Sequence, residues 1–181
     1  MKLLNILDEK EKVLHQVSKD ITFPLSSKDK DLIKDMIEYL TKSQIDKYIE
    51  EFCLRPGMGL AFVQLGILKR IAVVVLEVDD EQFENYILIN PKIISASEEL
   101  IYAGEGEGCL SVKEDQPGFV MRHARITIET YDLDGNKYTF RAREALAIAI
   151  QHELDHMDGI LYYERINQQN PFFIPPGARE I

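Results

Sequence analysis

Two histidines four residues apart, His152 and His156, follow a wholly apolar stretch and constrain the fold more than any other feature of the sequence. Periodicity alone would allow the stretch from Ala145 to Ile150 to be a buried strand. Its alanine content and the length of the whole unit favour a buried helix from Glu144 to about Met157, which Asp158-Gly159 ends. On such a helix, residues four apart lie on the same face, so both imidazoles can point at one cation.

Glu153 completes an HExxH pattern with the two histidines. This is the arrangement of metallohydrolases, in which the glutamate serves as general base beside the metal. The alternative interpretation is an ordinary pair of surface histidines. The apolar turns before them imply burial, and a buried ionisable cluster needs a partner charge such as a metal. We therefore expect a metal site on this helix.

A catalytic metal site needs a third protein ligand and one open position. A histidine at position 162 would supply one, but that residue is Tyr162. Glu164 is too close along the chain, and Glu180 lies in a tail rich in proline and glycine. Cys109 is the better candidate, because glycines precede it and a thiolate is a good ligand for zinc or ferrous iron.

The remaining cysteine and histidines carry no pattern that recommends them as ligands. A free cysteine is most often a small buried hydrophobe, which is the alternative for Cys109 and the role that we expect for Cys53. His15 and His123 are expected to be ordinary surface or half-buried residues.

Composition excludes several classes of protein. The formal net charge of −10 argues against a protein that coats nucleic acid, so we predict no direct nucleic-acid binding. The longest apolar stretches are too short to cross a bilayer, and the N-terminus meets an acidic residue before any long apolar run. Two cysteines make no disulfide framework. We expect one soluble, cytoplasmic domain over residues 1–181, without membrane association.

The rest of the chain predicts strands and one further amphipathic helix. Apolar residues at helical spacing predict a helix over 27–42 with Ser27 as its N-cap, and residues 45–52 either continue it or form a second short helix. Strands are expected at 71–78, 86–89, 125–131, 137–141 and 160–166, with a turn at Asp134-Gly135 between two of them. The predicted class is α+β, with antiparallel strands packed around a central buried helix that carries HExxH.

Three segments together resemble the three motifs of the peptide deformylases. They are Gly57 to Gln64 (GMGLAFVQ), Glu107 to Ser111 (EGCLS) and Gln151 to His156 (QHELDH), in the family's order and spacing. The resemblance runs from about residue 30 to residue 170, and the stretch before Arg122 is similar to the longer class of Gram-positive-type bacteria. Phe62 departs from the usual second alanine, which bears on the packing behind the glycine segment and on the pocket's shape.

The resemblance implies a reaction and a cofactor. The reaction is hydrolytic removal of the N-terminal formyl group from formyl-methionyl nascent peptides, with release of formate. The cofactor is one divalent metal ion, with Fe²⁺ favoured in the cell and Ni²⁺, Co²⁺ or Zn²⁺ able to substitute. Cys109, His152 and His156 are the ligands that the resemblance implies.

The resemblance also implies catalytic roles. Glu153 acts as base and then as acid, while the Gln64 amide and the Leu110 backbone N–H stabilise the oxyanion. Glu107 is expected to pair with Arg122 and fix the cysteine loop, with two solvated charges as the alternative.

The substrate-binding residues implied by the resemblance are Gly59, Met58 and Gly108, with Met58 as a wall of the methionine pocket. Leu146 and Ile150 are weaker candidates for that pocket. Asp155 could bond to a ligating histidine, or instead face solvent or an arginine.

Three alternatives remain open from the sequence. They are an HExxH metallopeptidase, a deformylase-like hydrolase with another acyl preference, and a metal-stabilised binding module such as a ribosome-associated factor. The substrate emerges at the ribosome, so transient ribosome proximity is compatible with the enzyme, but the net charge of −10 predicts no stable binding there.

Overall fold

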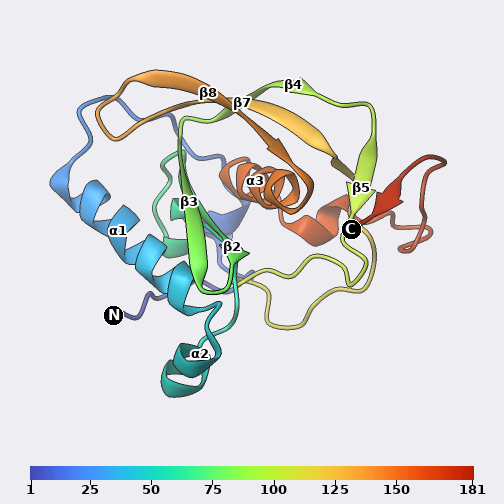
Figure 1. The fold of residues 1–181 in the computed structure, drawn as a ribbon, viewed down its shortest axis with the longest axis horizontal. Coiled ribbons are helices and arrows are strands. Elements are labelled where there is room, and N and C mark those ends of the chain that lie inside the picture. Colours follow the sequence, from blue (N-terminus) through green and yellow to red (C-terminus); the bar gives the residue numbers. More distant parts are fainter.

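The computed structural model describes residues 1–181 and has three α-helices and three small sheets (Figure 1). The helices are α1 (Ser27–Lys42), α2 (Asp46–Phe52) and α3 (Glu144–Met157), with 3-10 segments η1 (Lys12–His15), η2 (Phe62–Leu65) and η3 (Tyr162–Arg165). The strands are β1 (Gly59–Ala61), β2 (Ile71–Asp79), β3 (Gln82–Ile89), β4 (Lys92–Ala96), β5 (Leu100–Tyr102), β6 (Arg122–His123), β7 (Arg125–Tyr131), β8 (Lys137–Arg143) and β9 (Arg179–Glu180).

The strand pairs are antiparallel except β5 with β9. The sheet orders are β1-β2-β3, β4-β7-β8 and β6-β5-β9. The predicted α+β class with antiparallel strands is confirmed. No helix of the structure combines the length and the apolar composition that crossing a membrane requires.

From Ile71 to Val75, strand β2 is buried on both faces, which explains the apolar, mostly β-branched composition of this part. Successive side chains of a strand point to opposite faces. Ala72 and Val74 pack in the same apolar cluster as residues of α3, whereas Val73 and Val75 pack with Ile33 and other residues of α1. Figure 1 accordingly shows α1 and α3 on opposite sides of β2 and β3.

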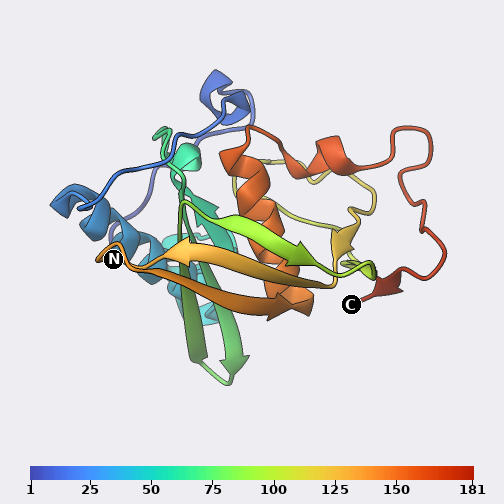
Figure 2. The ribbon, with the colours of Figure 1, turned by 90° about the horizontal axis from the view of Figure 1, so that it is seen from above.

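The sheet β4-β7-β8 lies across α3, as Figure 2 shows. Ile126 and Ile128 of β7 join Ala147 and Ile150 of α3 in one buried cluster. The helix therefore packs against two sheets, and its apolar first turns are buried because both sheets cover them.

The end of α3 follows the sequence prediction. Gly159 has φ +75°, a left-handed conformation that glycine adopts without strain. A Cβ at this position would meet the backbone carbonyl carbon of His15 at 2.8 Å. The Ile160 N–H donates to the Asp155 carbonyl at 2.9 Å and closes the last turn.

Three local predictions are wrong. Residues 160–166 form no strand; they contain the 3-10 turn η3, which the Glu164 carboxylate stabilises by accepting from the Leu161 N–H at 2.8 Å. Cys53 is exposed rather than buried, because it ends α2 in a left-handed conformation. The N-cap of α1 is Ser26, since its hydroxyl accepts from the Asp29 N–H at 3.1 Å, and Ser27 is the first helical residue.

This difference in the cap gives a direct test. Replacing Ser26→Ala should lower the free energy of unfolding by about 1 kcal/mol, because the Asp29 N–H then loses its acceptor. The matched change Ser27→Ala should stay within about 0.5 kcal/mol of the parent. Urea unfolding of both variants measures the difference, and equal losses would contradict the assigned cap.

Candidate active site

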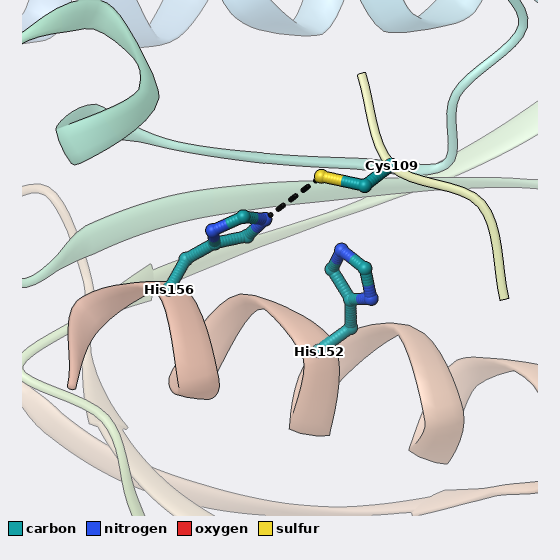
Figure 3. Close-up of side chains that lie close together, drawn as sticks. All are labelled: Cys109, His152 and His156. Atoms are coloured by element: carbon teal, nitrogen blue, oxygen red, sulfur yellow. Dashed lines mark hydrogen bonds between the residues drawn. The ribbon is translucent and has the colours of Figure 1, made fainter. Parts of the chain in front are cut away.

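Cys109, His152 and His156 come together as the sequence predicted. Cys109 and His156 are buried, and 11% of the His152 side chain is exposed. Their ligand atoms lie within 4.8 Å of one another, and the Cys109 Sγ is 3.2 Å from the His156 Nε2. Figure 3 shows both imidazoles rising from one face of α3 toward the thiol, which the loop before β6 supplies. One sulfur and two imidazole nitrogens, converging in this way, are a donor set that suits zinc or ferrous iron.

Glu107 orients the first of these histidines. Its Oε2 lies 2.8 Å from the His152 Nδ1, which leaves the His152 Nε2 available to a metal. Partners of this kind fix the ring and tautomer of a metal-binding histidine. Burial alone would lower the pKa of His152, but the neighbouring Cys109 and Glu107 outweigh it and raise that pKa well above its usual value. Burial lowers the pKa of His156, which keeps that imidazole neutral and able to bind a metal.

The predicted ion pair between Glu107 and Arg122 is confirmed, and it is buried rather than solvated. The Arg122 Nε is 2.7 Å from one Glu107 oxygen and the Arg122 Nη2 is 2.9 Å from the other. Burial by itself would raise the pKa of Glu107, but Arg122 and His152 lower it to about 2. Asp155 faces arginines rather than a histidine, with 2.6 Å between its Oδ2 and the Arg122 Nη1.

Glu153 lies buried beside the three ligands. Its Oε2 has no hydrogen-bond partner in the protein. Burial raises the pKa of Glu153 to about 7. Gly59 makes room for this carboxylate, because a Cβ at position 59 would overlap the Glu153 Oε1 and lie 2.7 Å from its Cδ. The site thus holds one carboxyl group that can exchange a proton near neutral pH.

Gln64 is also held in place. The Ala61 N–H donates to its Oε1 at 2.8 Å, and its Nε2 lies 3.2 Å from the Ser111 hydroxyl and 3.8 Å from the Cys109 sulfur. Its amide nitrogen therefore faces the cysteine loop. The Leu110 backbone N–H, in the same loop, donates to no other group of the chain.

A cavity of about 460 Å³ opens beside these groups. Met58, Gly59, Gly108 and Leu110 line it, together with Gln64, Cys109, His152 and Glu153. Every residue predicted as a metal ligand, a catalytic group or a main substrate contact therefore lines the cavity, except His156, which contacts Cys109.

The apolar wall on α3 differs from the sequence prediction. Leu146 and Ile150 do not line the cavity; both pack in the apolar cluster beneath the sheets. Ile148 and Ala149 line it instead. Helical spacing could have identified them, because they lie four residues before His152 and Glu153 and so share their face.

Phe62 is fully buried and does not line the cavity. It packs in the cluster that joins α1 to β2, with residues such as Ile33 and Val73. This departure from the family pattern therefore fills the core behind the glycine segment and adds no side chain to the cavity wall.

The buried pair gives a prediction for stability. Glu107→Gln should lower the free energy of unfolding by about 3 kcal/mol at pH 7, because it leaves Arg122 buried with one carboxylate fewer. Folding lowers the pKa of Glu107 from 4.5 to about 2. The ionised carboxylate therefore stabilises the folded protein fully above pH 4.5, and this stabilisation is lost as the pH falls toward 2. The difference in the free energy of unfolding between variant and parent, measured with urea, should therefore be smaller at pH 3 than at pH 7.

Glu105→Gln is the matched control, since Glu105 is exposed in the same loop. It should change stability by less than about 0.5 kcal/mol. Equal losses for the two variants, or a gap that is constant with pH, would contradict the assigned pair.

Comparisons with known proteins agree with this geometry. Residues 3–172 match the family described as polypeptide deformylase. A peptide deformylase of Ligilactobacillus salivarius is 47% identical over 177 residues, which are 96% of this chain and 95% of that protein. Peptide deformylase 2 of Bacillus anthracis is 38% identical over 177 residues, which are 98% of this chain and 96% of that protein.

Solved structures extend the similarity to the fold. A probable peptide deformylase of a Synechococcus phage has a TM-score of 0.74 at 31% identity, over 90% of this chain and 99% of its own. A peptide deformylase of Acinetobacter baumannii, solved with Met-Ala-Ser bound, has a TM-score of 0.73 at 25% identity, over 91% of this chain and 99% of its own. The chain belongs to the peptide deformylase family, metal-dependent hydrolases that remove N-terminal formyl groups from nascent peptides.

Proposed function

We propose that this chain hydrolyses the formyl group of formyl-methionyl nascent peptides and releases formate, with Glu153 as the acid and base. Residues 1–181 act as one catalytic domain around α3, the central helix that carries HExxH. The observation that carries the proposal is the unpartnered Glu153 Oε2, buried in the cavity beside a Cys109, His152 and His156 cluster. Family membership favours this reaction over internal peptide cleavage by a metallopeptidase.

Cys109, His152 and His156 would hold one divalent ion, which is Fe²⁺ in the cell, with Ni²⁺, Co²⁺ or Zn²⁺ able to substitute. The donor set and the Glu107 partner of His152 support this assignment. When bound, such an ion acts as a Lewis acid that lowers the pKa of a nearby water.

Glu153 moves one proton in two steps. It first accepts a proton from the attacking water while the water oxygen adds to the formyl carbon. It then gives that proton to the peptide nitrogen as the carbon–nitrogen bond breaks, so that formic acid and a free amine leave, and the acid ionises to formate in water. Burial, which raises the pKa of Glu153, makes this carboxyl group better able to carry a proton between the water and the leaving amine.

Negative charge develops on the formyl oxygen during the attack, and it needs donors already in place. The Gln64 amide supplies one, since its other contacts with Ala61 and Ser111 hold it still. The Leu110 backbone N–H supplies the second and is not engaged elsewhere in the chain.

The peptide lies extended along β1, in the manner of an added strand. β1 is an edge strand, because it pairs only with β2 in its sheet. Gly59 and Gly108 offer backbone groups on the cavity wall, and the methionine side chain contacts Met58, Ile148 and Ala149. Substrate is met in the cytoplasm as it leaves the ribosome, and contact with the ribosome is transient, because a net charge of −10 gives no general attraction to RNA.

The first test measures formate release from formyl-Met-Ala-Ser by protein loaded with Fe²⁺ without oxygen, or with Ni²⁺ in air. Glu153→Ala and Glu153→Gln should each reduce kcat by more than a hundredfold while the metal content is unchanged, because the proton carrier is lost. Glu98→Gln, an exposed carboxylate away from the cavity, is the control and should keep the parent rate.

The same assay separates the alternatives. Acetyl-Met-Ala-Ser should not be hydrolysed, and neither should an internal bond of an unformylated peptide. Hydrolysis of the acetyl peptide in preference to the formyl peptide would show that the enzyme removes another acyl group than formyl. Near-normal turnover by Glu153→Gln would remove Glu153 from the mechanism.

A second variant tests the oxyanion donor. Gln64→Leu should lower kcat and kcat/KM equally, by about a hundredfold, because the lost hydrogen bond exists only in the transition state. Metal content should stay at the parent level, since Gln64 is not a ligand. An effect confined to KM would assign Gln64 to ground-state binding instead.

A further inference from the structure

The buried ion pairs beneath His152 continue past Arg122 to the protein surface. Asp155 accepts from Arg122 and also from Arg165, whose Nη2 lies 2.7 Å from its Oδ1 and whose Nε lies 3.2 Å from its Oδ2. Arg165 ends η3, and 47% of its side chain is exposed. An unbroken chain of hydrogen bonds thus runs from an exposed arginine to a metal-site histidine, through Asp155, Arg122 and Glu107.

Arg165 completes the charge balance of this chain. Its three inner members, Glu107, Asp155 and Arg122, are all at least nine-tenths buried, and with His152 neutral as a metal ligand they carry one excess negative charge. Buried charges are costly unless they are paired. Arg165 supplies the missing positive charge in a two-pronged contact that only a guanidinium forms with a carboxylate.

The same turn also contacts His152 directly. The Tyr162 ring stacks on the His152 ring, with centroids 6.0 Å apart and planes at 21°. The Tyr162 hydroxyl accepts from the Gln116 N–H at 2.7 Å, so the ring is held at both ends. η3 therefore supports the histidine on one side and the carboxylate chain on the other.

We propose that Arg165 is a positioning residue for the metal site: by holding Asp155, it keeps Arg122 against Glu107 and so fixes the ring of His152. The inference rests on the proposed metal site. Residues that orient a ligating histidine typically change metal affinity tenfold to a hundredfold when they are removed. Arg165 acts through three intermediates, so we expect the lower end of that range.

The experiment loads each variant with Co²⁺ and follows the thiolate-to-cobalt absorption as an excess of chelator removes the metal. Arg165→Met should release Co²⁺ about tenfold faster than the parent and alter the cobalt absorption spectrum. Arg165→Lys should recover part of the loss, because it restores the charge without the two-pronged contact. In turnover of formyl-Met-Ala-Ser, kcat should fall while KM is unchanged.

Arg179→Met is the matched control. Arg179 is also 47% exposed and also bonds carboxylates, Glu144 at 2.7 Å and Glu99 at 3.3 Å, but it has no link to His152. It should leave the rate of Co²⁺ release within twofold of the parent. The comparison removes any general effect of losing one surface charge.

A double-mutant cycle tests the route. In an Asp155→Asn background, Arg165→Met should have little further effect on Co²⁺ release, because the carboxylate through which it acts has been neutralised. Full, additive effects of the two changes would overturn the proposed route. So would a lower unfolding temperature for Arg165→Met with unchanged metal release and spectrum.

Two failures are distinguishable. A parent protein that takes up no Co²⁺ overturns the proposed metal site, and this inference with it. A parent that binds Co²⁺ and turns over normally, with Arg165→Met behaving like Arg179→Met, overturns this inference alone.

Discussion

The guanidinium of Arg122 joins three parts of the chain at the site. It lies in β6, and it bonds Glu107 of the cysteine loop and Asp155 of α3. The loop between β5 and Cys109 is rich in glycine and has few side chains of its own to pack. Since Glu107 is two residues from Cys109 and also bonds His152, the ion pair restrains the loop that carries the thiol. Replacing a whole buried pair by apolar residues often costs little, whereas removing one partner is costly, so the pair matters chiefly for the geometry that it specifies.

Burial of α3 serves the fold and the chemistry at once. The apolar residues of its first turns pack between two sheets, and that packing brings Glu153 into a region where the charged carboxylate is less favourable. The protein makes this burial possible by keeping position 59 free of a Cβ, because β1 passes directly over Glu153. Glu153 and the strand proposed to bind the peptide are therefore adjacent.

The parts of the fold that the sequence predicted are those with local signals. Helical spacing and alanine content predicted α3, the Asp-Gly turn predicted the β7–β8 hairpin, and the absence of another third ligand pointed to Cys109. What it did not predict depends on contacts between distant segments. The exposure of Cys53 follows from where α2 ends, and the choice of Ile148 over Ile150 follows from the rotation of α3 against the cavity. The choice of Ser26 over Ser27 as the cap depends on a shift of one residue, which composition does not resolve.

The wrong prediction for the turn after α3 also left the contacts of Tyr162 and Arg165 with α3 unpredicted. In a strand over 160–166, Tyr162 and Arg165 would point to opposite faces, because side chains alternate with a period of two residues. In a 3-10 helix, which has three residues per turn, side chains three apart lie on the same side. Tyr162 can then stack on His152 while Arg165 bonds Asp155, one turn farther along α3. The 3-10 conformation, stabilised by the Glu164 carboxylate on the Leu161 N–H, is thus what allows a surface arginine to act on a buried histidine.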